Sequence, residues 1–384
     1  MAKKLRVGIL FGGRSGEHEV SLLSAASILK AIDRDKFDVV PIGITKEGRW
    51  LAAGAAQNLL EGDTSPVARR LRAGDPASTP GAKLLHEGIP TLLAPEPGQR
   101  ANTALDVVFP VLHGTFGEDG TIQGLFELAG IAYVGSGVLG SAAGMDKDVM
   151  KRLFAQAKLP IVKHVTLLRA DWEMARRKCV AQVEAALHYP VFVKPANLGS
   201  SVGISKAHDR KELGPALDLA AKYDRKLIVE HGVGGKSAKA RELEVAVLGN
   251  DAPEASVVGE VVPIKEFYDY EAKYLSEGSD LIVPAKLTKA QSKQVREMAI
   301  AAFRVCDCAG LARVDFLMEP GASGRGRSGK IYVNEINTLP GFTSISMYPR
   351  LWAASGVPYP KLIDRLIELA IERRADKDRN KYSR

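Results

Sequence analysis

Two short segments in the last quarter of the chain alternate apolar and polar residues, the pattern of strands that bury one face. They are residues 311–316 and 331–337. Because successive side chains of a strand point to opposite faces, the polar residues of each segment share one face. Those residues are Arg313 and Asp315 in the first segment, and Glu335 and Asn337 in the second. The chain is therefore expected to contain two strands that gather polar chemistry on one face.

The connector between these segments, residues 319–330, is rich in Gly, Pro and Ser, which predicts an antiparallel hairpin. A hairpin would place two carboxylates and an amide oxygen beside the Arg313 guanidinium. Oxygen ligands of this kind suit Mg²⁺, which usually takes one or two protein carboxylates together with substrate phosphate oxygens. A charged sheet face exposed to solvent has the same spacing, so the spacing alone leaves both interpretations open.

Length and composition predict a soluble enzyme. A chain of 384 residues with 46% hydrophobic content can bury a sizeable core, and usual domain sizes suggest two or three domains. No apolar run approaches the roughly 20 residues that span a bilayer. The first residues lead into a strand and not into a signal-peptide apolar region. We therefore expect a cytoplasmic location.

Cysteine content and charge exclude other classes. The cysteines Cys179, Cys306 and Cys308 have no second pair or neighbouring His to complete a zinc site, so reduced structural thiols are expected. The net charge of +8 comes from dispersed basic residues without interleaved aromatics, which disfavours nucleic-acid binding. A basic surface of this kind also fits a small anionic substrate.

The first part of the chain has an α/β pattern. Residues 6–11 are typical of a buried strand, followed by a Gly-rich turn and a helix that starts near Gly16. Residues 37–44 and 105–112 predict further apolar strands, so one parallel-sheet domain is expected. Between them, residues 53–102 are rich in Ala, Gly and Pro, which indicates an irregular insertion or surface excursion whose role the sequence does not reveal.

The rest of the chain predicts two further units with α+β elements. Helical patterns start at Met145, and strands are expected at 190–194, 227–230 and 242–248. The expected domain ranges are 1–135, 136–230 and 231–384.

The Gly-rich turn at residues 11–16 is of the type that cradles phosphate at a helix N-terminus. Its glycine spacing is not that of a dinucleotide-binding motif, and the second strand ends at Thr45 without an acidic residue to hold a ribose. A dehydrogenase is therefore disfavoured. Glu17, in the first helical turn, either complements the helix dipole or holds a substrate ammonium group.

Two later loops carry candidate chemistry. His113 follows an apolar strand, where open α/β sheets bind ligands, although a lone His is often structural. Residues 194–206, flanked by the strand with Lys194 and by another expected around residues 202–205, resemble a phosphate clamp. Lys194 supplies a point charge, while Gly199 and Gly203 let backbone N–H groups approach the oxygens. No Walker A motif occurs. An ordinary hairpin turn remains the alternative.

Together these residues resemble the ATP-grasp superfamily and, within it, the D-alanine–D-alanine ligase family. The resemblance covers nearly the whole chain, in seven motifs that stand in the family's order. The motifs are residues 12–21, 112–120, 145–147, 194–203, 267–274, 312–315 and 334–341.

The resemblance implies a three-domain ATP-grasp fold with an N-terminal parallel-sheet, Rossmann-like domain. It implies that ATP converts one D-alanine into D-alanyl phosphate, which a second D-alanine attacks to give D-alanyl-D-alanine, ADP and phosphate for peptidoglycan precursor synthesis. It also implies two Mg²⁺ ions, with Mn²⁺ as an alternative, and a homodimer.

Roles carried over by this resemblance fall into four groups. The implied ATP-binding residues are Lys147, Lys194, Ser201, Glu230 at the adenine side, Val233, Glu242 at the ribose and Lys273. The implied site for the first D-alanine consists of Glu17, Ser200, Tyr274 and His113. The implied oxyanion donors are Arg313 and the backbone N–H of Gly341. The second amino acid is implied to bind at Ser344 and Ser346. The implied metal ligands are Asp315, Glu335 and Asn337.

Tyr274 also bears on the second substrate. In the family a Tyr at this position accompanies D-alanine, whereas His or Phe accompanies D-lactate, so a dipeptide product is expected. Residues 266–279 are either a loop that closes over the acyl phosphate to exclude water or a plain surface loop.

Two other functions stay open from the sequence. A different ATP-grasp ligase would keep the metal and phosphate residues without Glu17, Tyr274 and Ser346. A nucleotide-binding regulatory module would be expected to lose Arg313 or a metal ligand, and all of these are present. The family varies in length at 53–102, 232–241 and the hairpin connector, and none of these segments removes a motif residue.

Overall fold

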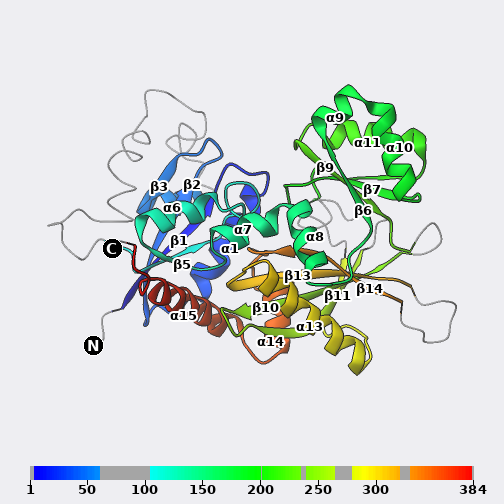
Figure 1. Cartoon of the computed structure of the whole chain (residues 1–384). Helices are drawn as coiled ribbons and strands as arrows, with labels where there is room; N and C mark the ends of the chain where they lie inside the picture. Colours follow the sequence, from blue (N-terminus) through cyan, green and yellow to red (C-terminus); the bar gives the residue numbers. More distant parts are fainter. Residues whose placement is uncertain are drawn as a thin grey trace.

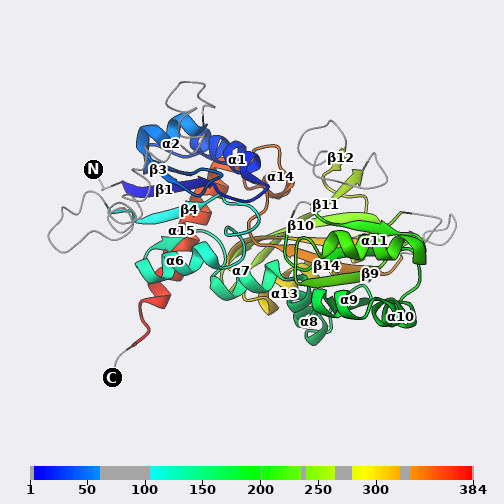
Figure 2. The same cartoon turned by 90° about the horizontal axis from the view of Figure 1, so that it is seen from above.

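The computed structural model describes residues 4–60, 104–199, 201–234, 239–263, 279–320 and 329–382. Strands of these residues form three sheets (Figures 1 and 2). The described helices are α1 (His18–Ala31), α2 (Ala53–Leu60), α6 (Thr121–Ala129), α7 (Val138–Met145), α8 (Lys147–Gln156), α9 (Arg169–Met174), α10 (Arg176–Ala186), α11 (Arg210–Ala220), α13 (Lys289–Val305), α14 (Met347–Ala354) and α15 (Tyr359–Lys377).

The first sheet is the expected α/β unit. Its strands are β1 (Leu5–Gly12), β2 (Phe37–Ile44), β3 (Trp50–Ala52), β4 (Val107–Pro110) and β5 (Ala132–Tyr133), in the order β3-β2-β1-β4-β5. All neighbours run parallel except β3, an antiparallel edge strand. Because β1 is central and is buried from Val7 onward, its sequence from there is a continuous apolar run. The loops after the parallel strands β1 and β4 emerge at the same edge of the sheet.

The second sheet lies in the middle of the chain. Its strands are β6 (His164–Leu168), β7 (Val191–Pro195), β8 (Ser205–Ala207) and β9 (Lys226–His231), in the order β6-β9-β7-β8. All its pairs are antiparallel. The helices α9, α10 and α11 pack on it, as the upper right of Figure 1 shows. The loop between β7 and β8 is the predicted phosphate clamp, so it does connect two strands of a hairpin.

The third sheet contains the polar hairpin. Its strands are β10 (Arg241–Gly249), β11 (Glu254–Pro263), β12 (Ser279–Ile282), β13 (Gly310–Met318) and β14 (Ile331–Asn337), in the order β12-β11-β10-β13-β14. Helix α13 packs against four of these strands, and α8 contacts β14. The apolar side chains of β13 and β14 face α13 and α8 in one buried cluster, which leaves the other face for the polar residues.

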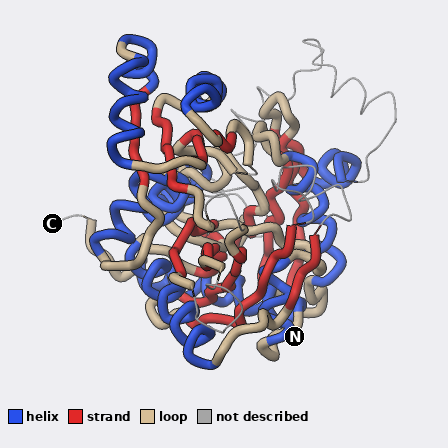
Figure 3. The backbone as a smooth tube through the Cα atoms, turned by 90° about the vertical axis from the view of Figure 1, so that its right-hand side faces the viewer, coloured by secondary structure: helices blue, strands red, loops and turns tan. Residues whose placement is uncertain are grey.

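Helix α15 returns from the third sheet to the first. It contacts β4, β5 and α1 as well as β10 and β13, and it runs below the first sheet in Figure 1. Its apolar residues, including Leu362 and Leu366, share one core cluster with β1 and α14. The strands lie inside and the helices mostly outside (Figure 3). The first and third sheets therefore share a continuous hydrophobic core.

Three expectations about local structure need correction. Helix α1 begins at His18, two residues later than predicted, because Gly16 and Glu17 still belong to the turn. Strand β8 begins at Ser205, and Val202 lies in the preceding turn. The stretch called irregular begins with helix α2, where Ala56 is fully buried and Leu59 packs against the core.

The remaining part of that stretch, residues 61–102, lies outside the described residues, as do positions 266–278 of the predicted closing loop and 321–328 of the hairpin connector.

Candidate active site

Strands β13 and β14 pair as the predicted antiparallel hairpin. Arg313 lies opposite Asn337, and Asp315 lies opposite Glu335. The register shifts directly after Asp315, an irregularity of the kind that often redirects side chains beside a functional site. All four side chains are partly buried on the same side of the hairpin. The charged face that the alternation predicted is therefore assembled by strand register.

Arg313 is held between two carboxylates. Its Nε donates to Asp315 Oδ1 and its Nη2 to Asp315 Oδ2, both at 2.7 Å. Its Nε also lies 3.1 Å from Glu244 Oε2, on the neighbouring strand β10 and opposite Asp315. A two-pronged guanidinium–carboxylate pair fixes the plane of the guanidinium. Glu244, which the sequence analysis did not single out, helps to fix that orientation.

Lys147 reaches the hairpin from helix α8. Its Nζ lies 3.6 Å from Glu335 Oε2 and donates to the Leu198 carbonyl oxygen at 2.9 Å. Helix α8 begins at Lys147 because the Asp146 side chain caps it, accepting from the backbone N–H groups of Asp148 and Val149. The cap therefore places a lysine between the hairpin and the phosphate-clamp loop.

A buried carboxylate lies between two lysines. Glu230 Oε1 is 2.6 Å from Lys151 Nζ, and Glu230 Oε2 is 2.6 Å from Lys194 Nζ. Burial would raise the pKa of Glu230, but the two ammonium groups outweigh burial and hold that pKa well below its ordinary value.

Lys194 sits where several acidic groups meet. Burial opposes its charge, but the carboxylates of Glu230, Glu335 and Glu242 outweigh burial and raise its pKa. Lys194 is therefore cationic. Its charge interacts with Glu230 and Glu242, which the resemblance also assigns to ATP binding.

Glu17 is packed against two loops. An added Cβ at Gly114 would meet Glu17 Oε2 at 2.6 Å, and one at Gly199 would meet the same oxygen at 2.9 Å. Glycine is needed at both positions for that close approach, and Gly114 also has a φ of +73°. The loops after β1, β4 and β7 thus converge on one buried carboxylate.

His113 is buried and held on both ring nitrogens. Its Nδ1 lies 2.9 Å from the Leu339 carbonyl oxygen, and its Nε2 lies 3.3 Å from Ser24 Oγ. A carbonyl only accepts, so Nδ1 carries the hydrogen and Nε2 accepts from the serine hydroxyl. Burial lowers the pKa of His113, although the Glu17 carboxylate opposes that effect. His113 is therefore a neutral imidazole at the base of the site.

Glu118 links the loop of His113 to the chain after β14. Its Oε2 accepts from the Gly114 N–H at 2.8 Å, and its Oε1 accepts from the Leu339 N–H at 3.2 Å. Burial, reinforced by the negative charge of Glu17, raises the pKa of Glu118 to about 8. Glu118 could not be assigned a role from the sequence, because one of its two partners, Leu339, is distant in the chain.

The segment after β14 places Gly341 beside Ser346. A Cβ at Gly341 would lie 3.4 Å from Ser346 Oγ. That hydroxyl also accepts from the Thr343 N–H at 3.1 Å, at the start of helix α14. Ser344 is exposed, and its N–H donates to Ser27 Oγ on α1 at 3.1 Å. These contacts tie the expected oxyanion donor and the expected second-substrate residues into one turn against α1.

The remaining expected residues divide into two sets. Ser201 lies in the β7–β8 loop, and Val233 lies in the turn after β9, both partly buried. Ser200, Lys273 and Tyr274 lie outside the described residues.

The hairpin ligands fit a hard cation. Asp315 and Glu335 supply carboxylates, and Asn337 supplies an amide oxygen that also accepts from the Leu339 N–H at 3.1 Å. This donor chemistry suits Mg²⁺. In the described part of the chain no group of three or more His, Cys, Asp and Glu side chains could hold a metal ion by themselves.

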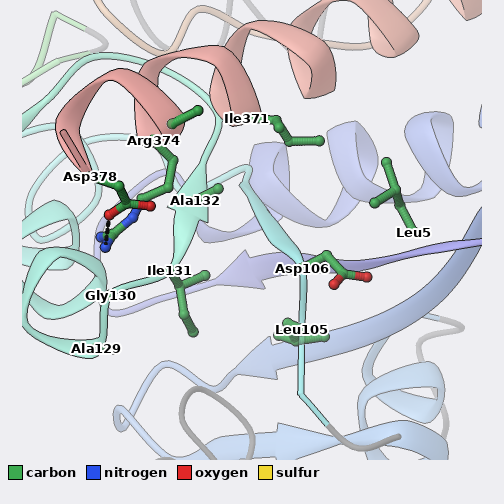
Figure 4. A pocket seen from close by; sticks show the side chains of 11 residues that line it. Leu5, Leu105, Asp106, Ala129, Gly130, Ile131, Ala132, Ile371, Arg374 and Asp378 are labelled. Atoms are coloured by element: carbon green, nitrogen blue, oxygen red, sulfur yellow. Dashed lines mark hydrogen bonds and ion pairs between the residues drawn. The ribbon is translucent and has the colours of Figure 1, made fainter. Parts of the chain in front are cut away.

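The described residues line two cavities, and one of them adjoins the candidate site. One of about 280 Å³ is lined by Gly13, Ser15 and His113, at the carboxyl edge of the first sheet. Another of about 540 Å³ lies where β5 begins, beside α15 (Figure 4). Its Arg374 and Asp378 pair with each other, and Asp106 accepts from the Arg6 N–H. Only the smaller cavity adjoins the chemistry described above.

Comparisons with known proteins agree along the whole chain. The family model described as D-ala D-ala ligase N-terminus matches residues 6–136, and that described as D-ala D-ala ligase C-terminus matches residues 153–368. A D-alanine–D-alanine ligase of Heliobacterium modesticaldum is 51% identical over 382 residues, covering 99% of this chain and 98% of the relative. That of Bacillus cytotoxicus is 47% identical over 380 residues, covering 99% of each.

Solved structures give the same picture. The D-alanine–D-alanine ligase of Coxiella burnetii superimposes with a TM-score of 0.76 at 35% identity, covering 98% of this chain and 97% of that chain. The VanG D-Ala:D-Ser ligase of Enterococcus faecalis gives a TM-score of 0.75 at 33% identity, covering 96% and 100%. Within the described residues, no helix has both the length and the apolar character of a membrane span.

Proposed function

The chain belongs to the D-alanine–D-alanine ligase family, and from that premise we propose how its residues divide the work of the reaction. The enzyme joins two D-alanines at the cost of ATP in peptidoglycan synthesis. The observation that carries the residue roles is the pairing of Arg313 with Asn337 and of Asp315 with Glu335, beside Lys147. A carboxylate is a poor acyl donor, so this reaction needs cations around a phosphoryl group in transfer.

ATP is proposed to lie between the second and third sheets. Lys147 and Lys194 would contact its phosphates, since both ammonium groups point into the gathering of carboxylates at the hairpin. The Glu230 carboxylate pairs with two lysines. Contacts with adenine would therefore be made by the backbone of Glu230 and by Val233. Glu242 is proposed for the ribose. Ser201 and Lys273 are proposed as further ATP contacts from the family resemblance.

Asp315, Glu335 and Asn337 are proposed to hold two Mg²⁺ ions, or Mn²⁺ in their place. Bound there, the ions would supply charge neutralisation for the phosphoryl transfer. Arg313, which pairs with Asp315, would keep that carboxylate oriented and would present its own charge to the reacting carbonyl.

The two amino acids are proposed to lie on the side of the first sheet. Glu17 would hold the ammonium of the first D-alanine, with Ser200 and Tyr274 beside it, and neutral His113 would lie near the reacting carboxylate. The second D-alanine must attack as a free amine, which produces a tetrahedral oxyanion. Arg313 and the Gly341 N–H are proposed to bind that oxyanion.

The second amino acid is proposed to bind through its carboxylate. Ser346, with Ser344 nearby, would receive it, because the Ser346 hydroxyl stands beside Gly341. In this proposal the oxyanion donor Gly341 and the carboxylate site Ser346 would both lie in the turn between β14 and α14.

Three properties of the whole protein are proposed from the family resemblance. The chain would form a homodimer and would work in the cytoplasm, where ATP is available. The domain ranges would be 1–135, 136–230 and 231–384, with α15 returning to the first domain.

One incubation tests the proposal. The purified chain is mixed with ATP, Mg²⁺ and D-alanine or L-alanine, and phosphate release is followed with product identification. We expect phosphate and D-alanyl-D-alanine with D-alanine only. Adding D-lactate or D-serine as competitors at neutral pH tests the second site, because Tyr274 predicts the dipeptide D-alanyl-D-alanine. Dominant formation of a depsipeptide or of D-alanyl-D-serine would contradict the proposed second substrate.

A further inference from the structure

Lys151 is a buried lysine that none of the proposed roles uses. It lies one helical turn after Lys147 on α8, and its side chain is only 1% exposed. Its Nζ donates to the Asn334 carbonyl oxygen on β14 at 3.0 Å and pairs with Glu230 on β9 at 2.6 Å. A lysine this deep is rare without a partner that requires it. It connects strands of the second and third sheets.

The charge balance of the cluster indicates what Lys151 does. Glu230 presents one oxygen to Lys151 and the other to Lys194. With both lysines protonated, the three groups carry a net charge of +1. If Lys151 were uncharged, Glu230 and Lys194 would form a neutral buried pair. At close range in a poorly solvated site, that pair would attract an approaching polyphosphate far less than a cation does.

The exposure of the three groups supports this division. The Lys194 side chain is 13% exposed, whereas Lys151 and Glu230 are 1% and 3% exposed. Of the three groups, Lys194 is therefore the one that solvent can reach, and its charge also interacts with Glu335 and Glu242. Lys151 lies behind it and cannot contact a bound nucleotide from its position.

We propose that Lys151 is a positioning residue for ATP: by sharing the Glu230 carboxylate, it leaves Lys194 with a net positive charge directed at the ATP phosphates. This inference rests on the proposed function, because Lys194 is assigned to the phosphates there. It differs from a purely structural role, in which Lys151 would only neutralise Glu230 and hold β9 against β14.

Calorimetric binding of ATP to three variants of the full chain tests the proposal. Lys151→Met makes the cluster neutral and is expected to weaken ATP binding by about tenfold or more. Lys151→Met combined with Glu230→Gln restores a net +1 through Lys194 alone. That double variant is expected to bind ATP within about threefold of the wild type, a coupling typical of residues in one charged network. The matched control is Lys178→Met, an exposed lysine on α10.

Steady-state kinetics separate positioning from structure. The KM for ATP should rise in Lys151→Met while the KM for D-alanine stays within about twofold, since its partners Glu230 and Asn334 are not part of the proposed D-alanine site. The proposal would be overturned if Lys151→Met bound ATP normally, or if the double variant bound no better than the single one.

A further comparison tests the proposal even if Lys151→Met fails to fold. Glu230→Gln alone leaves a net charge of +2 on the two lysines, and the double variant leaves +1 on Lys194, so both variants keep a cation for the ATP phosphates. Each should therefore bind ATP at least within about threefold of the wild type. Loss of ATP binding in the double variant, while Glu230→Gln retains it, would mean that Lys151 acts on ATP directly, against the proposal. A wild-type chain that binds ATP but makes no dipeptide would refute only the proposed function, whereas one that binds no ATP would refute both.

Discussion

Asp315 on β13 and Glu335 on β14 are cross-strand partners, so the hairpin itself sets the spacing of the two proposed metal carboxylates. The same register places Arg313 opposite Asn337. Side chains alternate with a period of two, so a slip of one residue would move one strand's polar groups to the opposite face. The apolar residues between them are buried against α8 and α13, which makes such a slip costly. Core packing on one face therefore fixes the chemistry on the other.

Arg313→Ala is expected to remain folded and to lose nearly all activity. Removing one oxyanion donor typically costs about 10²–10³ in turnover. The change would also leave the Asp315 and Glu244 carboxylates facing each other without the cation between them, so a lower melting temperature is expected too. Turnover with ATP, Mg²⁺ and D-alanine is the measurement, with exposed Arg177→Ala as the control. Near-normal turnover in Arg313→Ala would show that the oxyanion assignment is wrong.

Glu335→Gln is expected to raise the Mg²⁺ concentration needed for half-maximal activity. The loss should be at least about tenfold, since even a supporting partner of a metal ligand contributes 10–100-fold. Binding of Mn²⁺ to the chain without substrates gives a second readout that does not depend on turnover. Glu297→Gln, at an exposed position of α13, is the matched control. An unchanged Mg²⁺ requirement would remove Glu335 from the metal site.

Gly199→Ala is expected to impair the use of D-alanine without unfolding the chain. The added Cβ would meet Glu17 Oε2 at 2.9 Å, and that atom is the far end of a flexible side chain, so the carboxylate is expected to shift while the backbone stays in place. The KM for D-alanine should rise by about tenfold, the value of a weakened charged contact. The control is Gly16→Ala, where an added Cβ meets nothing within 4 Å. If both variants behaved alike, Glu17 would not be the ammonium site.

The sequence predicted those parts of the site that follow a local pattern. Alternation in 311–316 and 331–337 identified the hairpin face, and Gly199 identified a loop whose backbone comes close to another group, the Glu17 carboxylate. Lys147 came only from the family resemblance, although the Asp146 cap that starts its helix is a local signal.

Other contributors have no local signal. Glu244, Lys151 and Glu118 each act across elements that are distant in the chain, at separations that no periodicity encodes. Only the fold shows that Glu118 joins two loops or that Lys151 shares a carboxylate with Lys194. A hint was present for Lys151, since it lies four residues after Lys147 and so on the same helix face.

Glu118 is expected to make the stability of the fold depend on pH. Its pKa is raised from an ordinary value near 4.5 to about 8, so between these values the folded state holds a proton that the unfolded state has lost. The stability contributed by this group is therefore fully present below about pH 4.5 and is lost as pH rises through about 8. The loss is at most about 1.4 kcal/mol per pH unit.

Glu118→Gln cannot titrate at this position, so it tests the effect. From pH 5 to pH 8 the free energy of unfolding of the wild type should fall relative to that of the variant. Urea unfolding at four pH values measures it, with exposed Glu173→Gln as the control. Parallel pH profiles for wild type and Glu118→Gln would show that the carboxyl is not held protonated between the two loops.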